Sequence, residues 1–217
     1  MTEGDGAQLA TNMKLISIDL NGMQPKRLLD SLFQNRTELR SINLINLTTE
    51  GTGLVYFNEL PRMNALKELK LNFGRLRDAD IKKQAKNYRF APGSCPSLES
   101  LQIQYQVVGK GVSIANQSWM DFFGMFSGLK NFTLIGASGT EEPTFWPRVL
   151  SSMPALKALE LRQCQTNAQV LESLAVPMTD PNCQITHLTF DYAAVDAVNK
   201  SVKVRKPPTF DPIEALL

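Results

Sequence analysis

A short apolar phrase recurs along the chain and strongly limits how it can fold. The segment MPALKALEL (153–161) has a close copy in MNALKELKL (63–71) and weaker ones in CPSLESLQI (95–103) and FSGLKNFTL (126–134). Written as apolar-x-x-apolar-x-apolar, seven copies begin 24, 27, 32, 31, 27 and 29 residues apart. Such periodic self-similarity is typical of repeat proteins. The copies are Leu15/Ile18/Leu20, Leu39/Ile42/Leu44, Leu66/Leu69/Leu71, Leu98/Leu101/Ile103, Leu129/Phe132/Leu134, Leu156/Leu159/Leu161 and Ile185/Leu188/Phe190.

Each phrase predicts a short strand, because its last two apolar residues lie two positions apart and so share one face. Between the phrases, apolar residues recur at helical spacing. We therefore expect strand–helix units that stack into a bent array, with the strands on its inner wall, because one unit alone cannot bury its apolar face. The predicted helical faces are Leu28, Leu29, Leu32 and Phe33; Trp119, Phe122, Phe123 and Phe126; Trp146, Val149, Leu150 and Met153; and Val170, Leu171 and Leu174.

These repeats resemble the leucine-rich repeat family. The period near 28 is similar to that of its ribonuclease-inhibitor-like branch, also seen in F-box/leucine-rich proteins, and the resemblance covers about residues 13–193. It implies an α/β leucine-rich-repeat solenoid of about seven repeats, with a curved parallel sheet on the concave face and helices on the convex face. The chain departs from the family at the residue three past the last strand leucine, usually Asn or Cys, where only Cys164 matches.

Two short segments flank the predicted repeat domain at 13–193. Residues 1–12 form a polar N-terminal tail, and residues 194–217 are expected to form a short helix and then a basic, Pro-containing tail. Terminal repeats need a polar cover, which the residues before the first phrase are too few and too polar to provide. We expect another subunit, or a chain segment missing from this sequence, to cap the N-terminal edge. For the same reason we expect no F-box within these residues.

The resemblance implies that the solvent-facing strand positions form a protein-binding surface. Arg162 can make a bidentate contact, and Tyr105, Ile45 and Ile135 can anchor apolar groups. Any sheet open to water also alternates apolar and polar positions, which gives each residue an alternative, purely structural explanation. The candidate binding residues on this concave face are Asp19, Asn43, Lys70, Asn72, Gln102, Gln104, Tyr105, Glu160, Arg162, His187 and Asp191.

The third and fourth units are longer than the others, and the excess falls at 86–95 and 106–118. Binding residues on repeat scaffolds often lie in such loops. A basic and aromatic loop patch is a second candidate for protein binding. The alternative is an ordinary surface loop that is anchored by one hydrophobic side chain. The candidate loop residues are Tyr88, Arg89, Phe90 and Lys110.

Composition argues against several other partners and compartments. The net charge of the 217 residues is +2, too close to neutral to predict a nucleic-acid or anionic-lipid surface. No segment approaches the roughly 18 apolar residues of a membrane span, and no signal peptide is visible. Three cysteines, an odd number, fit reduced thiols in an intracellular protein, cytoplasmic or nuclear. Five Asn-x-Ser/Thr triplets, at Asn35, Asn46, Asn116, Asn131 and Asn199, are the only feature that favours an extracellular chain, and without an export signal we interpret them as incidental.

No catalytic, metal or cofactor site is expected. His187 is the only histidine and has no Cys or carboxylate at ligand spacing. The glycines of GTG (51–53) and GKG (109–111) lack a phosphate-loop frame, and Glu141 and Glu142 fit a solvated turn. We therefore expect a non-catalytic scaffold for protein–protein interaction.

Within that class, the sequence favours a recognition or assembly subunit of a larger complex, similar to a ubiquitin-ligase substrate receptor. Two alternatives stay open: a regulator of an enzyme, such as a GTPase-activating protein, and a fragment of an extracellular leucine-rich receptor.

Overall fold

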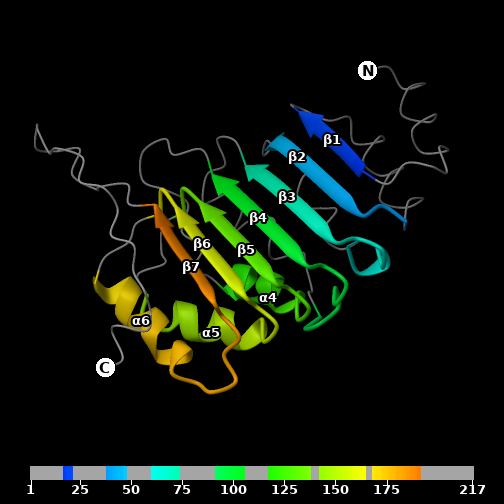
Figure 1. Ribbon diagram of the computed structural model, residues 1–217. Coiled ribbons are helices and arrows are strands. Elements are labelled where there is room, and N and C mark those ends of the chain that lie inside the picture. Colours follow the sequence, from blue (N-terminus) through cyan, green and yellow to red (C-terminus); the bar gives the residue numbers. More distant parts are fainter. Residues whose placement is uncertain are drawn as a thin grey trace, which may run out of the picture.

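The computed structural model describes residues 17–21, 38–47, 60–73, 91–105, 117–137, 142–164 and 168–191. These ranges form an α/β structure with one seven-stranded sheet, in which all neighbouring strands are parallel (Figure 1). The strands are β1 (Ser17–Asn21), β2 (Ser41–Leu47), β3 (Glu68–Phe73), β4 (Ser100–Tyr105), β5 (Asn131–Ile135), β6 (Ala158–Arg162) and β7 (His187–Asp191). The described helices are α4 (Gln117–Gly124), α5 (Phe145–Ser152), α6 (Ala168–Met178) and the 3-10 segment η2 (Leu60–Arg62).

The order of the strands in the sheet is their order in the chain, β1 to β7. Every strand begins two residues after the first apolar residue of its phrase, so the seven predicted strands are confirmed. Parallel neighbours need a crossover of a dozen residues or more, and a period of 24 to 32 residues leaves room for one. All described residues fall inside the predicted repeat domain, whereas the predicted tails at 1–12 and 194–217 lie outside them.

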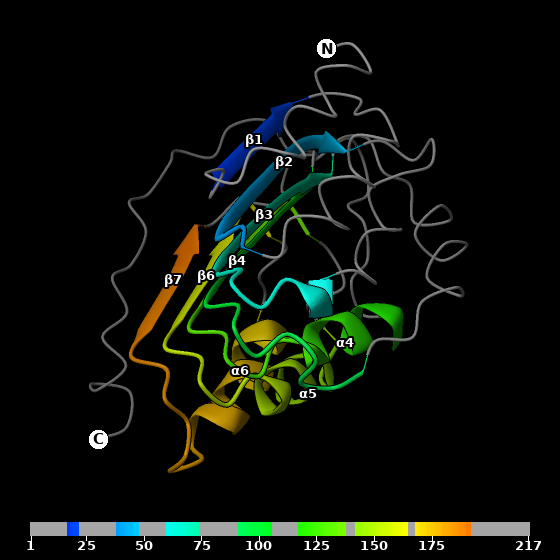
Figure 2. The same ribbon diagram turned by 90° about the vertical axis from the view of Figure 1, so that its right-hand side faces the viewer.

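One face of the sheet packs against the helices, which lie together on one side of it (Figure 2). In β3 and β4 alternate residues are buried, as the two-residue period of a strand requires. The apolar members of the phrases supply the first two buried positions of each strand, Phe73 and Tyr105 supply the third, and α4 and α5 cover this face with aromatic rings. Phe123 of α4 lies 5.4 Å from Phe132 of β5 and 6.5 Å from Phe145 of α5, measured between ring centroids. The core therefore lies between the sheet and the helices.

The structure corrects the predicted position of Tyr105. This side chain is only 3% exposed; its ring stacks on Phe73 at 5.5 Å and meets Trp119 edge-on at 6.0 Å. The physical reason is that β4 continues to Tyr105, which places it on the same face as Leu101 and Ile103. Tyr105 is a core residue and not a member of the open face.

A smaller correction concerns the helices. Val170 and Leu174 of α6 are buried as predicted, but Leu171 is 45% exposed, because it lies about 100° around the helix from Val170. The predicted helix with Leu28 to Phe33 lies outside the described residues. No helix among the described residues is long and apolar enough to cross a membrane.

Candidate binding surface on the open sheet face

The face of the sheet opposite the helices carries aligned rows of polar side chains. A parallel sheet in register places equivalent residues of successive strands side by side. The central row is Asp19, Asn43, Lys70, Gln102, Thr133, Glu160 and Thr189, and the row before it is Ser17, Ser41, Glu68, Ser100, Asn131, Ala158 and His187. The register thus places equivalent positions of the seven phrases side by side in these two rows.

A third row follows the central one but is interrupted between β2 and β3. Leu44 pairs with Leu71 and Leu47 with Phe73, so β2 has one extra residue there, and Ile45 has no partner on β3. From β3 onward the row is continuous and consists of Asn72, Gln104, Ile135, Arg162 and Asp191. Such a bulge bends a strand locally, so the surface of the third row is less regular at its β2 end.

Most of the predicted binding residues lie on this open face. Within the described residues, none of the helices covers it (Figures 1 and 2). The side chains of Asn43, Lys70, Asn72, Gln102, Gln104 and Glu160 are half-buried there, and those of Arg162 and His187 are exposed. The backbones of Asp19 and Asp191 belong to β1 and β7. Their side chains, and all of Tyr88, Arg89, Phe90 and Lys110, lie outside what the structure describes.

Two ion pairs within single strands fix charged groups on the open face. Lys70 Nζ lies 2.9 Å from Glu68 Oε1, and Arg162 Nη2 lies 2.7 Å from Glu160 Oε1. Each pair is two residues apart and therefore shares a face. Each carboxylate also accepts a hydrogen bond from the neighbouring strand: Ser41 Oγ donates to Glu68 at 2.9 Å, and Thr133 Oγ1 donates to Glu160 at 3.2 Å.

These contacts compensate the charges of the paired groups on the open face. The hydrogen bond from Lys70, followed by that from Ser41, lowers the pKa of Glu68, so its carboxylate stays ionised near neutral pH. Both cations of the face are paired with a carboxylate in the free protein. The two ion pairs therefore present oriented donors and acceptors of both signs and cancel their own charges, while Asp19 and Asp191 give the three rows a net charge of −2.

His187, at the β7 end, contacts the preceding residue, Thr186. Its Nδ1 lies 2.9 Å from Thr186 Oγ1, and the ring is exposed. No group of three His, Cys, Asp or Glu side chains that could hold a metal ion occurs in the described part of the chain.

A further row of charged residues, which the sequence reasoning missed, lies at the edge where the strands begin. It consists of Arg40, Lys67, Glu99, Lys130 and Lys157, and we call it the amino-edge row. Each residue directly precedes its strand. Every member after Arg40 donates its backbone N–H to the carbonyl of the previous member, from Lys67 to Arg40 (2.8 Å) through Lys157 to Lys130 (2.8 Å). The signal was present in the sequence: in five of the seven phrases, the residue after the first apolar position is charged.

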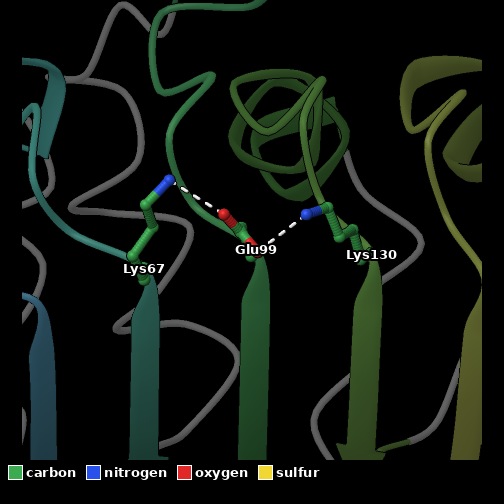
Figure 3. Close-up of polar contacts among 3 residues, drawn as sticks. All are labelled: Lys67, Glu99 and Lys130. Atoms are coloured by element: carbon green, nitrogen blue, oxygen red, sulfur yellow. Dashed lines mark hydrogen bonds and ion pairs between the residues drawn. The ribbon is translucent and has the colours of Figure 1, made fainter.

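Glu99 lies between two lysines of the amino-edge row (Figure 3). Lys67 Nζ and Lys130 Nζ each lie 2.8 Å from a different oxygen of its carboxylate. The hydrogen bonds from Lys130 and then Lys67 lower the pKa of Glu99 to about 2, from an ordinary value of 4.5. Because folding lowers this pKa, the contact stabilises the folded chain fully at pH values above the ordinary pKa of 4.5. This stabilisation is lost as the pH falls through about 2.

The chain was compared with known proteins. No family model matches it, and no curated protein matches it significantly.

Proposed function

We propose that this protein is a non-catalytic scaffold that binds a protein partner through the open face of its sheet and the adjoining loops. The observation that carries the proposal is the set of aligned polar rows across β1 to β7, opposite the helices. Their charged groups are already oriented by ion pairs in the free chain, so less side-chain entropy is lost when a partner binds.

The open face is large enough for about half of a standard protein interface, so the adjoining loops or sheet edges would supply the remaining area. Seven strands spaced about 4.8 Å apart span about 29 Å, and three rows about 6.6 Å apart span about 13 Å. The flat area is then about 380 Å², roughly half of the about 800 Å² that one partner buries in a standard interface. The partner would also contact residues at an edge of the sheet or in the loops.

We propose further that the protein is a leucine-rich-repeat solenoid of the ribonuclease-inhibitor-like branch, with the open face as its concave wall. The repeated phrase, the strand order and the helices on one face support this. Cys164, the one residue that matches the family position after the strand, is buried, and its Sγ lies 3.3 Å from the carbonyl oxygens of Leu134 and Arg162. This thiol thus links the ends of β5 and β6.

In this proposal the chain is a recognition or assembly subunit of an intracellular complex, similar to a ubiquitin-ligase substrate receptor. A cap on the N-terminal edge, supplied by another subunit or by further chain, is part of this proposal, since β1 is the end strand of the sheet.

The test reverses two charges of the open face, Lys70→Glu together with Arg162→Glu. Each reversal places a carboxylate beside the existing one, Glu68 or Glu160, and so repels any partner matched to the native pairs. A partner captured from the native cell with the unmodified protein is purified and titrated. The double variant should bind it at least about tenfold more weakly, which corresponds to about 1.4 kcal/mol.

The matched control is Arg148→Glu, a reversal of an exposed cation on α5, which lies on the helical side. This variant should bind the partner with the native affinity. Circular dichroism and the urea midpoint show whether each variant is folded. If the folded double variant retains the captured proteins and the native affinity, the open face is not the binding surface.

A further inference from the structure

We infer that the amino-edge row binds an acidic segment of the protein partner. This inference rests on the proposed function and names the chemistry of the partner where it crosses the starts of the strands. It concerns residues outside the three rows of the open face: Arg40, Lys67, Glu99, Lys130 and Lys157.

The backbone sets the spacing of the amino-edge row. Its members follow one another through backbone hydrogen bonds of 2.8 to 2.9 Å, one residue per strand from β2 to β6. Neighbouring strands are about 4.8 Å apart, so the row is about 19 Å long from Arg40 to Lys157. An extended peptide advances about 3.3 Å per residue, and a segment of about six residues would follow the whole row.

The amino-edge row carries the positive excess of the protein. Four cations and one carboxylate give it a net charge of +3, whereas the entire chain has +2, so all other residues together sum to −1. The four cationic residues are exposed. An acidic segment therefore meets a local positive field that the composition of the chain does not reveal.

The structure also contains an example of the contact that we infer. The carboxylate of Glu99 is held between Lys67 and Lys130, with both Nζ–O distances at 2.8 Å. Each lysine ammonium has three donors and gives one of them to Glu99. The charged groups of Arg40 and Lys157 make no ion pair with any described residue. A carboxylate of the partner can thus be held between Lys130 and Lys157, and another between Arg40 and Lys67.

The same observations favour an acidic peptide over a nucleic acid. Single-stranded nucleic acids bind where cations track the backbone and aromatic rings stack on the bases. The amino-edge row has no aromatic member, and the described residues of the next row inward, from Ser41 to His187, include no Phe, Tyr or Trp. That next row also includes Glu68, which would repel a second line of phosphates.

The experiment measures the binding of a fluorescein-labelled peptide of eight glutamates to the full chain by fluorescence anisotropy. An octaglutamine peptide is the uncharged control. At about 0.1 M ionic strength the octaglutamate should bind more tightly, and at about 1 M, where the Debye length is about 3 Å, its binding should be lost. Lys157→Glu and Arg40→Glu should each weaken binding about five- to tenfold, because exposed ion pairs contribute about 0.2–1 kcal/mol and each reversal also adds repulsion.

One variant is expected to act in the opposite direction. Glu99→Gln releases Lys67 and Lys130 and raises the net charge of the row from +3 to +4, so octaglutamate should bind about threefold more tightly, as expected for a surface ion pair. Arg148→Glu, on the helical side, changes the net charge by the same two units as Lys157→Glu and should leave the binding nearly unchanged.

The inference is overturned if octaglutamate and octaglutamine bind alike, if Arg148→Glu weakens binding as much as Lys157→Glu, or if ten-residue oligothymidylate binds more tightly than octaglutamate. These results leave the proposed function intact, because that depends on the Lys70→Glu/Arg162→Glu variant and its own partner. If that double variant loses the partner while Lys157→Glu leaves octaglutamate binding unaffected, the open face remains the proposed binding surface, and the inference about an acidic segment is wrong.

Discussion

Replacing Phe123 by alanine should lower the free energy of unfolding by about 3–5 kcal/mol, the usual cost of removing a buried phenyl ring. Phe123 is completely buried and connects three elements. Within α4 it stacks on Trp119 at 5.6 Å between ring centroids, and it also contacts Phe132 of β5 and Phe145 of α5. Its removal leaves a cavity between the sheet and two helices. Urea unfolding followed by circular dichroism measures the loss.

The matched control is Val176→Ala on α6, where the side chain is 64% exposed. This truncation should change the free energy of unfolding by less than about 0.5 kcal/mol. Equal effects of the two variants would contradict the packing described for α4, since they would mean that Phe123 is no more buried than Val176.

Gly128→Ala should lower the free energy of unfolding by about 1–3 kcal/mol, as overpacking does. Gly128 lies in the turn before β5, where a Cβ would collide with the carbonyl oxygen of Pro96 and lie 3.0 Å from its carbonyl carbon. Pro96 belongs to the corresponding turn before β4, so two successive turns touch through their backbones. Backbone atoms cannot rotate away as a side chain can, and the turns would have to separate.

Gly124→Ala provides the internal comparison for this prediction. Gly124 is the last residue of α4, and a Cβ there would meet no atom within 4 Å. Alanine favours a helix over glycine by about 0.5–1 kcal/mol, so this variant should be slightly more stable than the native protein. Thermal unfolding of both variants checks the opposite signs. A Gly128→Ala protein that is as stable as the native one would show that the two turns do not touch.

The strands were predictable because their signal is local and repeated. A pair such as Leu69 and Leu71 fixes which face of a strand is apolar, and the repetition fixes which residues of different strands lie side by side. The amphipathic helices α4 and α5 were predictable from helical spacing: Trp119 and Phe122 in α4, and Trp146 and Val149 in α5, lie three residues apart and are buried.

The predictions failed where the sequence does not determine how long a strand is or how a helix is rotated against the core. Tyr105 was assigned to the surface because the apolar phrase ends at Ile103, yet hydrogen bonding extends β4 by two residues. Leu171 is apolar but exposed, because the sequence does not specify how far the core wraps around α6. The repetition places Lys67, Glu99 and Lys130 at equivalent positions, but spacing does not show that their side chains form ion pairs, which only the structure reveals.

Each repeat contributes one strand to a single parallel sheet, in chain order. Pulsed electron–electron double resonance tests it with spin labels on cysteines that replace Asn43 and, in turn, Thr133, Glu160 and Thr189 of the central row. Cys183→Ser serves as the background, because Cys95 and Cys164 are buried and only Cys183 is partly exposed. With this strand order, the backbone separations from Asn43 to Thr133, Glu160 and Thr189 should be about 14, 19 and 24 Å, one strand spacing more at each step. Separations that do not increase from Thr133 to Glu160 to Thr189 would contradict it.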